Sequence, residues 1–299
     1  MRKSRTSGNL PLHIMLLPGV LLTIIFNYIP MFGIVIAFEK FVPAKGIFNQ
    51  KWIGLGNFIY MIHLPDTFQV LFNTVFIASM KIVAFIAVPV IFALLLNEIG
   101  KKFIKRTVQT LVYLPHFISW VILAGILIDV LSPSKGIVNQ VIKALGFQPV
   151  FFLGNEKLFP YVMVATNVWR DCGFEAIIYL AALTSIDPTH YESAIIDGAG
   201  RWRQTWSITL PGIMPIIVLV TTLSLGSVLN AGFDQIFNLL SPVVYRTGDI
   251  VDTLVYRLGL QDAQFGVATA AGLFKSVVSF AFITVSYKLA YRYSGYRVF

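Results

Sequence analysis

Residues 187–211 read DPTHYESAIIDGAGRWRQTWSITLP, a polar stretch that lies between two long apolar runs. Asp187 followed by Pro188 predicts a helix start, because Asp caps free backbone N–H groups and Pro fits the first helical turn. Gly198 predicts the end of that helix, since glycine readily adopts the left-handed conformation that closes many helices. The first half of the stretch therefore predicts a short helix at a membrane surface.

The second half of this stretch predicts another short helix over residues 201–208, which Leu210-Pro211 would end. Trp202 and Trp206 are four residues apart and would lie on one side of it. Two interpretations follow from the residues alone. The tryptophans could anchor a hairpin at the lipid headgroups, or the hairpin could meet another protein.

The rest of the chain has the composition of a membrane protein. Of its 299 residues, 57% are hydrophobic and 12% charged, and the mean hydropathy is +0.76. Runs of about 20 apolar residues can cross the hydrocarbon as helices. We expect an all-α polytopic protein with one membrane domain over residues 1–299. Its six spans are expected at 14–38, 70–97, 107–131, 159–184, 213–237 and 265–291.

The net charge of +9 does not indicate a nucleic-acid partner. Lys and Arg are concentrated in the short segments that share a side with the N-terminus, and are sparser in the longer loops opposite. The positive-inside bias therefore predicts that both termini are cytoplasmic and that the protein is multi-pass. The excess positive charge also favours contact with anionic membrane lipid.

The spacing of the polar stretch carries a family resemblance. Glu192-Ser193-Ala194, three residues, Gly198, nine residues and then Ile208-Thr209-Leu210-Pro211 resembles the EAA motif of permease subunits in ABC importers. That motif is Glu-Ala-Ala, three residues, Gly, nine residues and Ile-x-Leu-Pro. Only Ser193 departs from it, and Ser is also small.

The resemblance extends along the chain to the carbohydrate-importer permeases related to MalF, a group of binding-protein-dependent transport system inner membrane components. The matching segments are Leu16-Leu17-Pro18-Gly19, Asn73-Thr74, Tyr113-Leu114-Pro115, Gly226-Ser227 and Phe233-Asp234-Gln235-Ile236-Phe237. Tyr28-Ile29-Pro30, residues 238–242 and residues 248–253 look closest to the LplB-type branch, which is associated with complex oligosaccharides.

This resemblance implies the type I ABC importer permease fold, in which the EAA loop forms a coupling helix that docks on a cytoplasmic ATPase subunit. Glu192 would accept hydrogen bonds or pair with a basic group there, and Gly198 would permit close backbone contact. The implied ATPase-coupling residues are Tyr191, Glu192, Ser193, Ala194, Asp197, Gly198, Arg201, Leu210 and Pro211.

The resemblance also implies the partners and the reaction. The chain would pair with a second homologous permease, two ATPase subunits and an extracellular solute-binding protein in a bacterial cytoplasmic membrane. It would move an oligosaccharide or polysaccharide fragment inward by alternating access. ATP and Mg would be bound by the ATPase subunits, because this sequence contains no Gly-x-x-x-x-Gly-Lys-Ser/Thr stretch. We therefore expect no enzyme activity, cofactor or metal in this chain.

Three other functions stay open from the residues, and one of them is a non-transporting membrane scaffold or sensor. The permease could move another solute, such as an oligopeptide. Carboxylates within the predicted spans would also suit an ion-coupled secondary transporter, because such groups form proton relays.

Polar residues within the predicted spans are candidates for the substrate pathway, since sugars need hydrogen-bond donors and acceptors. They are Asn167, Trp169, Asp171, Glu175, Ser227, Asn230 and Asp234. The last three are expected at helical spacing on the fifth span. Alternatively, these groups tie helices to one another or to a partner permease.

The remaining charges near the spans have simpler expectations. Arg170 and Asp171 are adjacent and should point to different faces of their helix. Lys81 and Lys275 are expected near span ends, where reaching toward water or pairing satisfies them.

Overall fold

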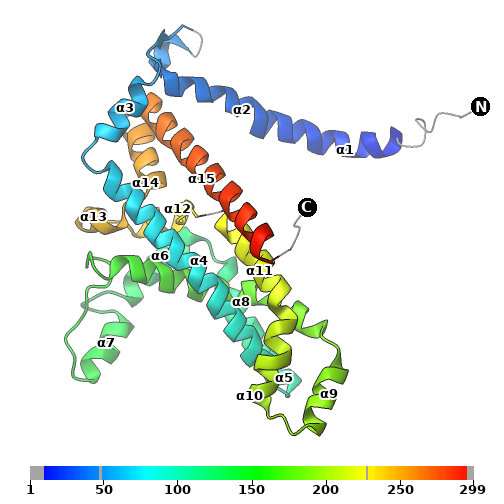
Figure 1. The fold of residues 1–299 in the computed structure, drawn as a ribbon. Helices are drawn as coiled ribbons and strands as arrows, with labels where there is room; N and C mark the ends of the chain where they lie inside the picture. The colour runs from blue at the N-terminus through cyan, green and yellow to red at the C-terminus, as the bar shows by residue number, and fades with distance from the viewer. Residues whose placement is uncertain (1–9, 47–48, 227, 295–299) are drawn as a thin grey trace, which may run out of the picture. The chain divides into compact units, whose positions relative to one another are not determined.

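The computed structural model describes residues 10–46, 49–226 and 228–294, which are mostly helical. The chain forms two compact units (Figure 1). The smaller comprises residues 1–64 and 255–273, and the larger comprises residues 65–254 and 274–299. Helices α14 (Val251–Tyr256) and α15 (Phe265–Ser294) contribute residues to both.

The smaller unit begins with a long apolar helical segment. Its parts are α1 (Leu10–Thr23), the π-turn η1 (Ile24–Tyr28), α2 (Ile29–Met31) and the 3-10 turn η2 (Phe32–Phe38). Strands β1 (Glu39–Lys40) and β2 (Lys51–Trp52) then pair antiparallel, with the 3-10 turn η3 (Pro43–Lys45) between them. Helix α3 (Gly56–His63) follows, and Asn57 Nδ2 donates to the carbonyl of Glu39 at 2.9 Å. The π-turn η7 (Arg257–Gln261) precedes α15.

The larger unit contains most of the helices. They are α4 (Thr67–Asn97), α5 (Lys102–Tyr113), α6 (Trp120–Val130), α7 (Ile137–Ala144), α8 (Phe159–Thr184), α9 (Pro188–Ile196), α10 (Arg201–Gln204), α11 (Leu210–Leu225), α12 (Phe233–Leu239) and α13 (Tyr245–Gly248). The 3-10 turns η4 (Leu114–Phe117) and η6 (Pro242–Val244) and the π-turn η5 (Thr205–Thr209) connect some of them. Helices α4 and α8 pack along one another, and their buried apolar residues include Ile77, Val90, Phe159 and Tyr179.

The all-α polytopic architecture is confirmed. Within the part of the chain that the structure describes, four helical segments are long and apolar enough to cross a membrane, and they are Leu12–Phe38, Thr67–Asn97, Arg201–Leu225 and Phe265–Val285. The bent pair Lys102–Phe117 and Trp120–Val130 would make a fifth span. Helix α8 coincides with the span expected at 159–184, and it contains three charged residues, Arg170, Asp171 and Glu175.

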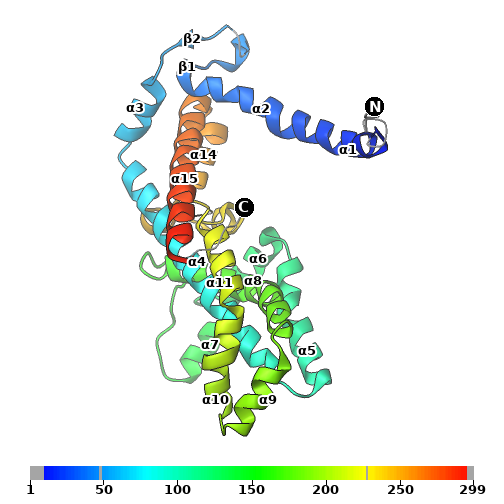
Figure 2. The same cartoon turned by 45° about the vertical axis from the view of Figure 1, so that its right-hand side comes forward.

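The third expected span, 107–131, is not one straight helix. The chain bends by 107° between η4 and α6, and Figure 2 shows α5 and α6 as separate rods. Pro115 lacks an N–H for the helical ladder. Ser119 then caps α6, with its side chain accepting from the Ile122 N–H at 3.4 Å. A proline followed by a new cap explains the break.

The fifth expected span, 213–237, is placed wrongly. Leu210-Pro211 does not end a short helix, because α10, η5 and α11 form one helical segment from Arg201 to Leu225. The π-turn η5 accommodates Pro211: the Leu210 N–H bonds to the carbonyl of Thr205, five residues back. The helix then stops at Leu225, and α12 starts only at Phe233 after Gly232, whose φ is +92°.

Candidate functional site

The polar hairpin, residues 187–211, starts as expected at a capped helix. The Asp187 carboxylate accepts from the Thr189 N–H at 2.9 Å, and Pro188 is the first residue of α9. This bond to the backbone N–H of Thr189 lowers the pKa of Asp187 below its usual value, since it stabilises the charged form. The cap is therefore ionised at neutral pH.

Helix α9 ends at Ile196, and Gly198 closes it, again as expected. The N–H of Gly198 bonds to the carbonyl of Ile195 at 3.0 Å, and that of Ala199 bonds to Ala194 at 2.8 Å. This is the Schellman pattern, and Gly198 has the positive φ, +76°, that it requires. A Cβ at Gly198 would meet nothing within 4 Å, so the chain itself needs glycine here for its backbone conformation.

Two side-chain contacts hold the halves of the polar hairpin together. Tyr191 of α9 bonds to Thr209 of η5, with 3.0 Å between the two hydroxyl oxygens. Gln204 Nε2 of α10 donates to the Ala199 carbonyl in the connecting turn at 2.7 Å. Helices α9 and α10 consequently lie side by side in both views (Figures 1 and 2).

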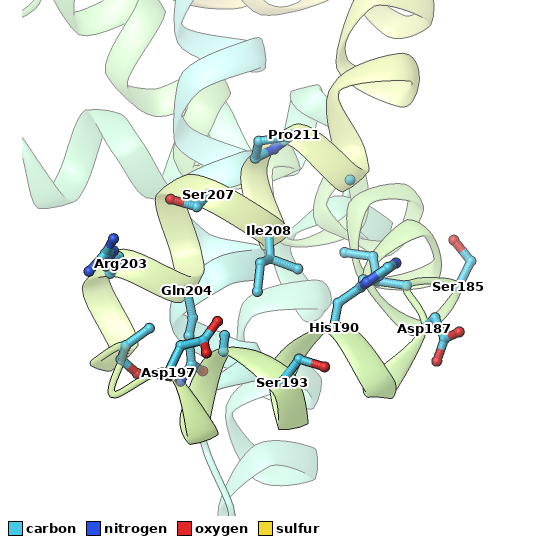
Figure 3. Close-up of a pocket in the computed structure, with 14 residues that line it drawn as sticks. Ser185, Asp187, His190, Ser193, Asp197, Arg203, Gln204, Ser207, Ile208 and Pro211 are labelled. Carbon is cyan, nitrogen blue, oxygen red and sulfur yellow. Dashed lines mark hydrogen bonds between the residues drawn. The ribbon is translucent and has the colours of Figure 1, made fainter.

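A groove of about 870 Å³ lies between α9 and the segment formed by α10, η5 and the start of α11. Figure 3 shows His190, Ser193 and Asp197 on the α9 side and Arg203, Gln204 and Ser207 on the other. Of the predicted coupling residues, Ser193, Ala194, Asp197 and Pro211 line this groove.

The other predicted coupling residues lie elsewhere on the polar hairpin. Glu192 is exposed and does not line the groove, and Arg201 pairs with Glu98 at 3.2 Å on the surface. Large apolar side chains are also exposed here, with Ile196 at 86% and Trp202 at 78%. The hairpin thus displays acidic, basic and apolar groups together.

A second polar cluster lies on α8. Asn167 Nδ2 donates to one Asp171 oxygen at 2.8 Å, while Arg170 Nη1 and His116 Nδ1 contact the other at 3.0 and 2.8 Å. Arg170 and Asp171 were expected on different faces. That expectation is wrong, because the long Arg side chain folds back to its neighbour. The His116 ring stacks on Phe174, with 4.0 Å between centroids.

Arg170 also reaches the bend between η4 and α6. Its Nη2 donates to the carbonyls of His116 at 3.0 Å and Ile118 at 3.2 Å, and its guanidinium lies 4.9 Å from the centre of the Trp120 ring. These carbonyls lie where the helical ladder is interrupted. Arg170 therefore supplies donors that the bent backbone lacks.

The predicted pathway residues are only partly brought together. Asn167 and Asp171 are bonded, and Glu175 follows one turn later on the same helix. Trp169 is 50% exposed and takes no part in that cluster. Among the described residues, no hydrogen bond joins Asn230 or Asp234 to α8.

The helical spacing expected for Asn230 and Asp234 is wrong. Asn230 lies in the break after α11, whereas Asp234 belongs to α12. Asn230 Oδ1 accepts from the Gly232 N–H at 3.4 Å, which is a local turn contact. Ser227 lies outside the described residues.

The family follows from the sequence match. The model described as "Binding-protein-dependent transport system inner membrane component" matches residues 86–295. The chain belongs to this family. It is a membrane component of a transport system, and this confirms the family expected from the EAA-like spacing.

Similar proteins cover nearly the whole chain. A Bacillus subtilis (strain 168) protein named polygalacturonan/rhamnogalacturonan transport system permease protein YteP is 40% identical, over 94% of this chain and 88% of its own length. Protein LplB of the same strain is 39% identical over 91% and 86%. A solved bacterial ABC transporter involved in import of the acidic polysaccharide alginate contains a chain with TM-score 0.88 and 38% identity, covering 96% of this chain and 97% of that one.

Sequence reasoning on this permease missed several structural contacts. Gln204 was not singled out, although it closes the hairpin turn. His116 was not singled out either, yet it joins Asp171 from 55 residues away. Lys81 was expected near a span end, but it is 6% exposed and lies in the middle of α4. Lys275 was expected either to reach toward water or to pair, and it pairs with Asp252.

Proposed function

We propose that this chain is the permease subunit of an ATP-driven ABC importer for an oligosaccharide or polysaccharide fragment. Family membership and the relatives' names support this proposal, since two similar bacterial systems are named for polygalacturonan/rhamnogalacturonan and for alginate. Both are polymers of acidic sugars. The substrate class proposed for this chain is therefore a glycan fragment delivered by a solute-binding protein.

The polar hairpin is the proposed docking element for a cytoplasmic ATPase subunit. The observation that carries this assignment is the exposed α9 helix, which has an ionised N-terminal cap, a Schellman end at Gly198 and an exposed Glu192 at the family spacing. A rigid helix with exposed charge and apolar side chains suits a protein partner. A lipid anchor would need only the tryptophans.

In this proposal the other components supply what the chain lacks. Two ATPase subunits bind ATP and Mg, a second permease completes the pathway, and an extracellular binding protein delivers the sugar. Both termini then face the cytoplasm, on the ATPase side. ATP binding moves the docked hairpins, and the permease pair alternates between inward-open and outward-open states.

The substrate pathway is proposed to run past the polar groups of α8 and the break after α11. Asn167, Trp169, Asp171, Glu175 and Asn230 offer donors, acceptors and one exposed aromatic face, which are the groups that sugars need. Asp234 and Ser227 stay in this proposal as neighbours of the break.

The test uses the complex purified through a tag on this chain and placed in proteoliposomes with its binding protein. Oligosaccharides prepared from polygalacturonan and from alginate serve as probes. Glu192→Lys and Gly198→Trp are each expected to lower uptake at least tenfold, because they reverse the charge and distort the backbone of the docking helix. ATP hydrolysis and membrane insertion are measured in parallel.

Asp262→Lys is the matched control, since it reverses an exposed acid outside the hairpin. It should leave uptake unchanged. Unchanged uptake in the Glu192 and Gly198 variants would overturn the docking role. Uptake of peptides but of neither glycan would overturn the sugar assignment, and uptake driven by an ion gradient without ATPase subunits would replace the importer proposal.

A further inference from the structure

Lys81 is a buried cation in the middle of α4. Its side chain is surrounded by protein, with 6% of the residue exposed. A charged group at membrane depth is costly unless its donors are satisfied. Lys81 Nζ donates to the Ala231 carbonyl at 2.7 Å and to Gln235 Oε1. Both acceptors belong to the segment that follows α11.

That segment is non-helical backbone within a membrane protein. Residues 228–232 are not helical, so backbone carbonyls there need other partners. Lys81 supplies a hydrogen-bond donor to the carbonyl of Ala231. Side chains in this segment alternate between buried and exposed. Leu229 and Ala231 are 2% and 0% exposed, while Asn230 between them is exposed.

The break is built around the lysine. Gly232 has a φ of +92°, and a Cβ there would lie 2.9 Å from Lys81 Nζ. A side chain at residue 232 would therefore displace the cation as well as strain the backbone. Glycine at this position allows the ammonium group to reach the carbonyl of Ala231.

Gln235 extends the contact to a third helix. Its Nε2 donates to the Met163 carbonyl at 2.8 Å and to Thr166 Oγ1 at 2.7 Å, both on α8. Gln235 is 1% exposed, so this polar chain is enclosed. Lys81 and Gln235 thus join α4, α12 and α8 at the break.

We propose that Lys81 is a positioning residue of the import step, which fixes residues 228–232 so that Asn230 is presented to the transported sugar. The proposal rests on the transport function proposed above. Asn230 Oδ1 is turned toward the Gly232 N–H, and its Nδ2 has no partner among the described residues. Nδ2 is a donor that a sugar hydroxyl or carboxylate can accept from.

The first test is hydrogen–deuterium exchange of the full complex in nanodiscs. Lys81→Met keeps the length of the side chain and removes its donors. Peptides covering residues 228–236 are expected to exchange roughly tenfold faster, because bonds from charged donors are among the stronger ones. Lys275→Met is the matched control: Lys275 pairs with Asp252, and its loss should leave those peptides unchanged.

The second test measures sugar transported per ATP hydrolysed, with binding protein loaded with oligogalacturonate. Lys81→Met is expected to lower this ratio at least fivefold, whereas a folding defect lowers both rates and leaves the ratio unchanged. In an Asn230→Ala background the same substitution should have a smaller effect, because both act through one contact.

The outcomes separate the two proposals. Unchanged exchange over 228–236 in Lys81→Met overturns the positioning of the break, whether or not the sugar is imported. Faster exchange with an unchanged ratio overturns the link to transport, and so does full additivity with Asn230→Ala. A wild-type complex that imports neither glycan contradicts the proposed function and leaves the exchange result to decide the role of Lys81 in the break.

Discussion

Two segments of this permease interrupt their helices, and each interruption is held by a cation from a continuous helix. At the bend between η4 and α6, Arg170 of α8 donates to two carbonyls. At the break between α11 and α12, Lys81 of α4 donates to one carbonyl and one side-chain amide. Helical backbone satisfies itself in a membrane, whereas interrupted backbone needs donors from elsewhere.

The two cations differ in their surroundings. Arg170 is partly exposed and lies against the carboxylate of Asp171, so its charge is neutralised locally. Lys81 is more deeply buried and bonds only to neutral oxygens. The planar guanidinium can donate to several acceptors at once, whereas the ammonium is a compact charge that fits a small enclosed site. The comparison indicates that the bend depends on a network that includes an ion pair, and the break on hydrogen bonds to neutral acceptors.

Arg170→Met is expected to have the largest effect on stability. It removes the donors to the bend and leaves Asp171 short of its main cation. We expect the free energy of unfolding to fall by about 2–4 kcal/mol, near the lower end of values for losing one partner of a buried pair. Unfolding of the purified chain by SDS, followed by circular dichroism, measures this.

Arg170→Lys is the control for charge. Lysine keeps the charge but cannot contact both carbonyls and the carboxylate, so it should fall between wild type and Arg170→Met. If Arg170→Met unfolds like wild type, the bend does not depend on the cation.

Gly232→Ala tests the break between α11 and α12. The new Cβ would clash with Lys81 Nζ and strain a backbone with φ of +92°, so we expect a loss of about 2 kcal/mol. Gly125→Ala in α6 is the matched control, because a Cβ there meets nothing within 4 Å. It should be neutral or stabilising by up to about 1 kcal/mol. Equal losses in the two variants would refute a special role for residue 232.

His116→Phe is expected to have the smallest effect. It keeps an aromatic ring against Phe174 and removes the hydrogen bond to Asp171, which retains Arg170 and Asn167. The expected loss is about 1 kcal/mol, measured by the same SDS unfolding. A loss as large as that of Arg170→Met would mean that His116, and not the guanidinium, secures the bend.

The sequence predicted the helical regions at 14–38, 70–97, 159–184 and 265–291 and both ends of α9, because apolar length and capping residues are local signals. Asp187-Pro188 and Gly198 act through their own backbone neighbours, so reading them needs no tertiary information. The family spacing located the polar hairpin for the same reason. The docking role of Glu192 and the pathway role of Asn230 stay predictions.

The interruptions were missed because hydropathy depends on composition alone and does not show where a helix bends or stops. The stretches around Pro115 and before Gly232 are mainly apolar. The stop signals were nevertheless present in Pro115 followed by Ser119, and in Asn230-Ala231-Gly232. Lys81 could not be placed from sequence, since its acceptor is a backbone carbonyl 150 residues away.

The unbroken run from Arg201 to Leu225 has a mechanical consequence. At 1.5 Å per residue, a helical segment of this length is a rod of about 37 Å, and it begins in the polar hairpin and ends beside the break. A tilt of about 10° applied at Trp202 would sweep the Leu225 end through roughly 6 Å for a rod of that length. A tilt of the polar hairpin would therefore also move the chain that leads to Asn230.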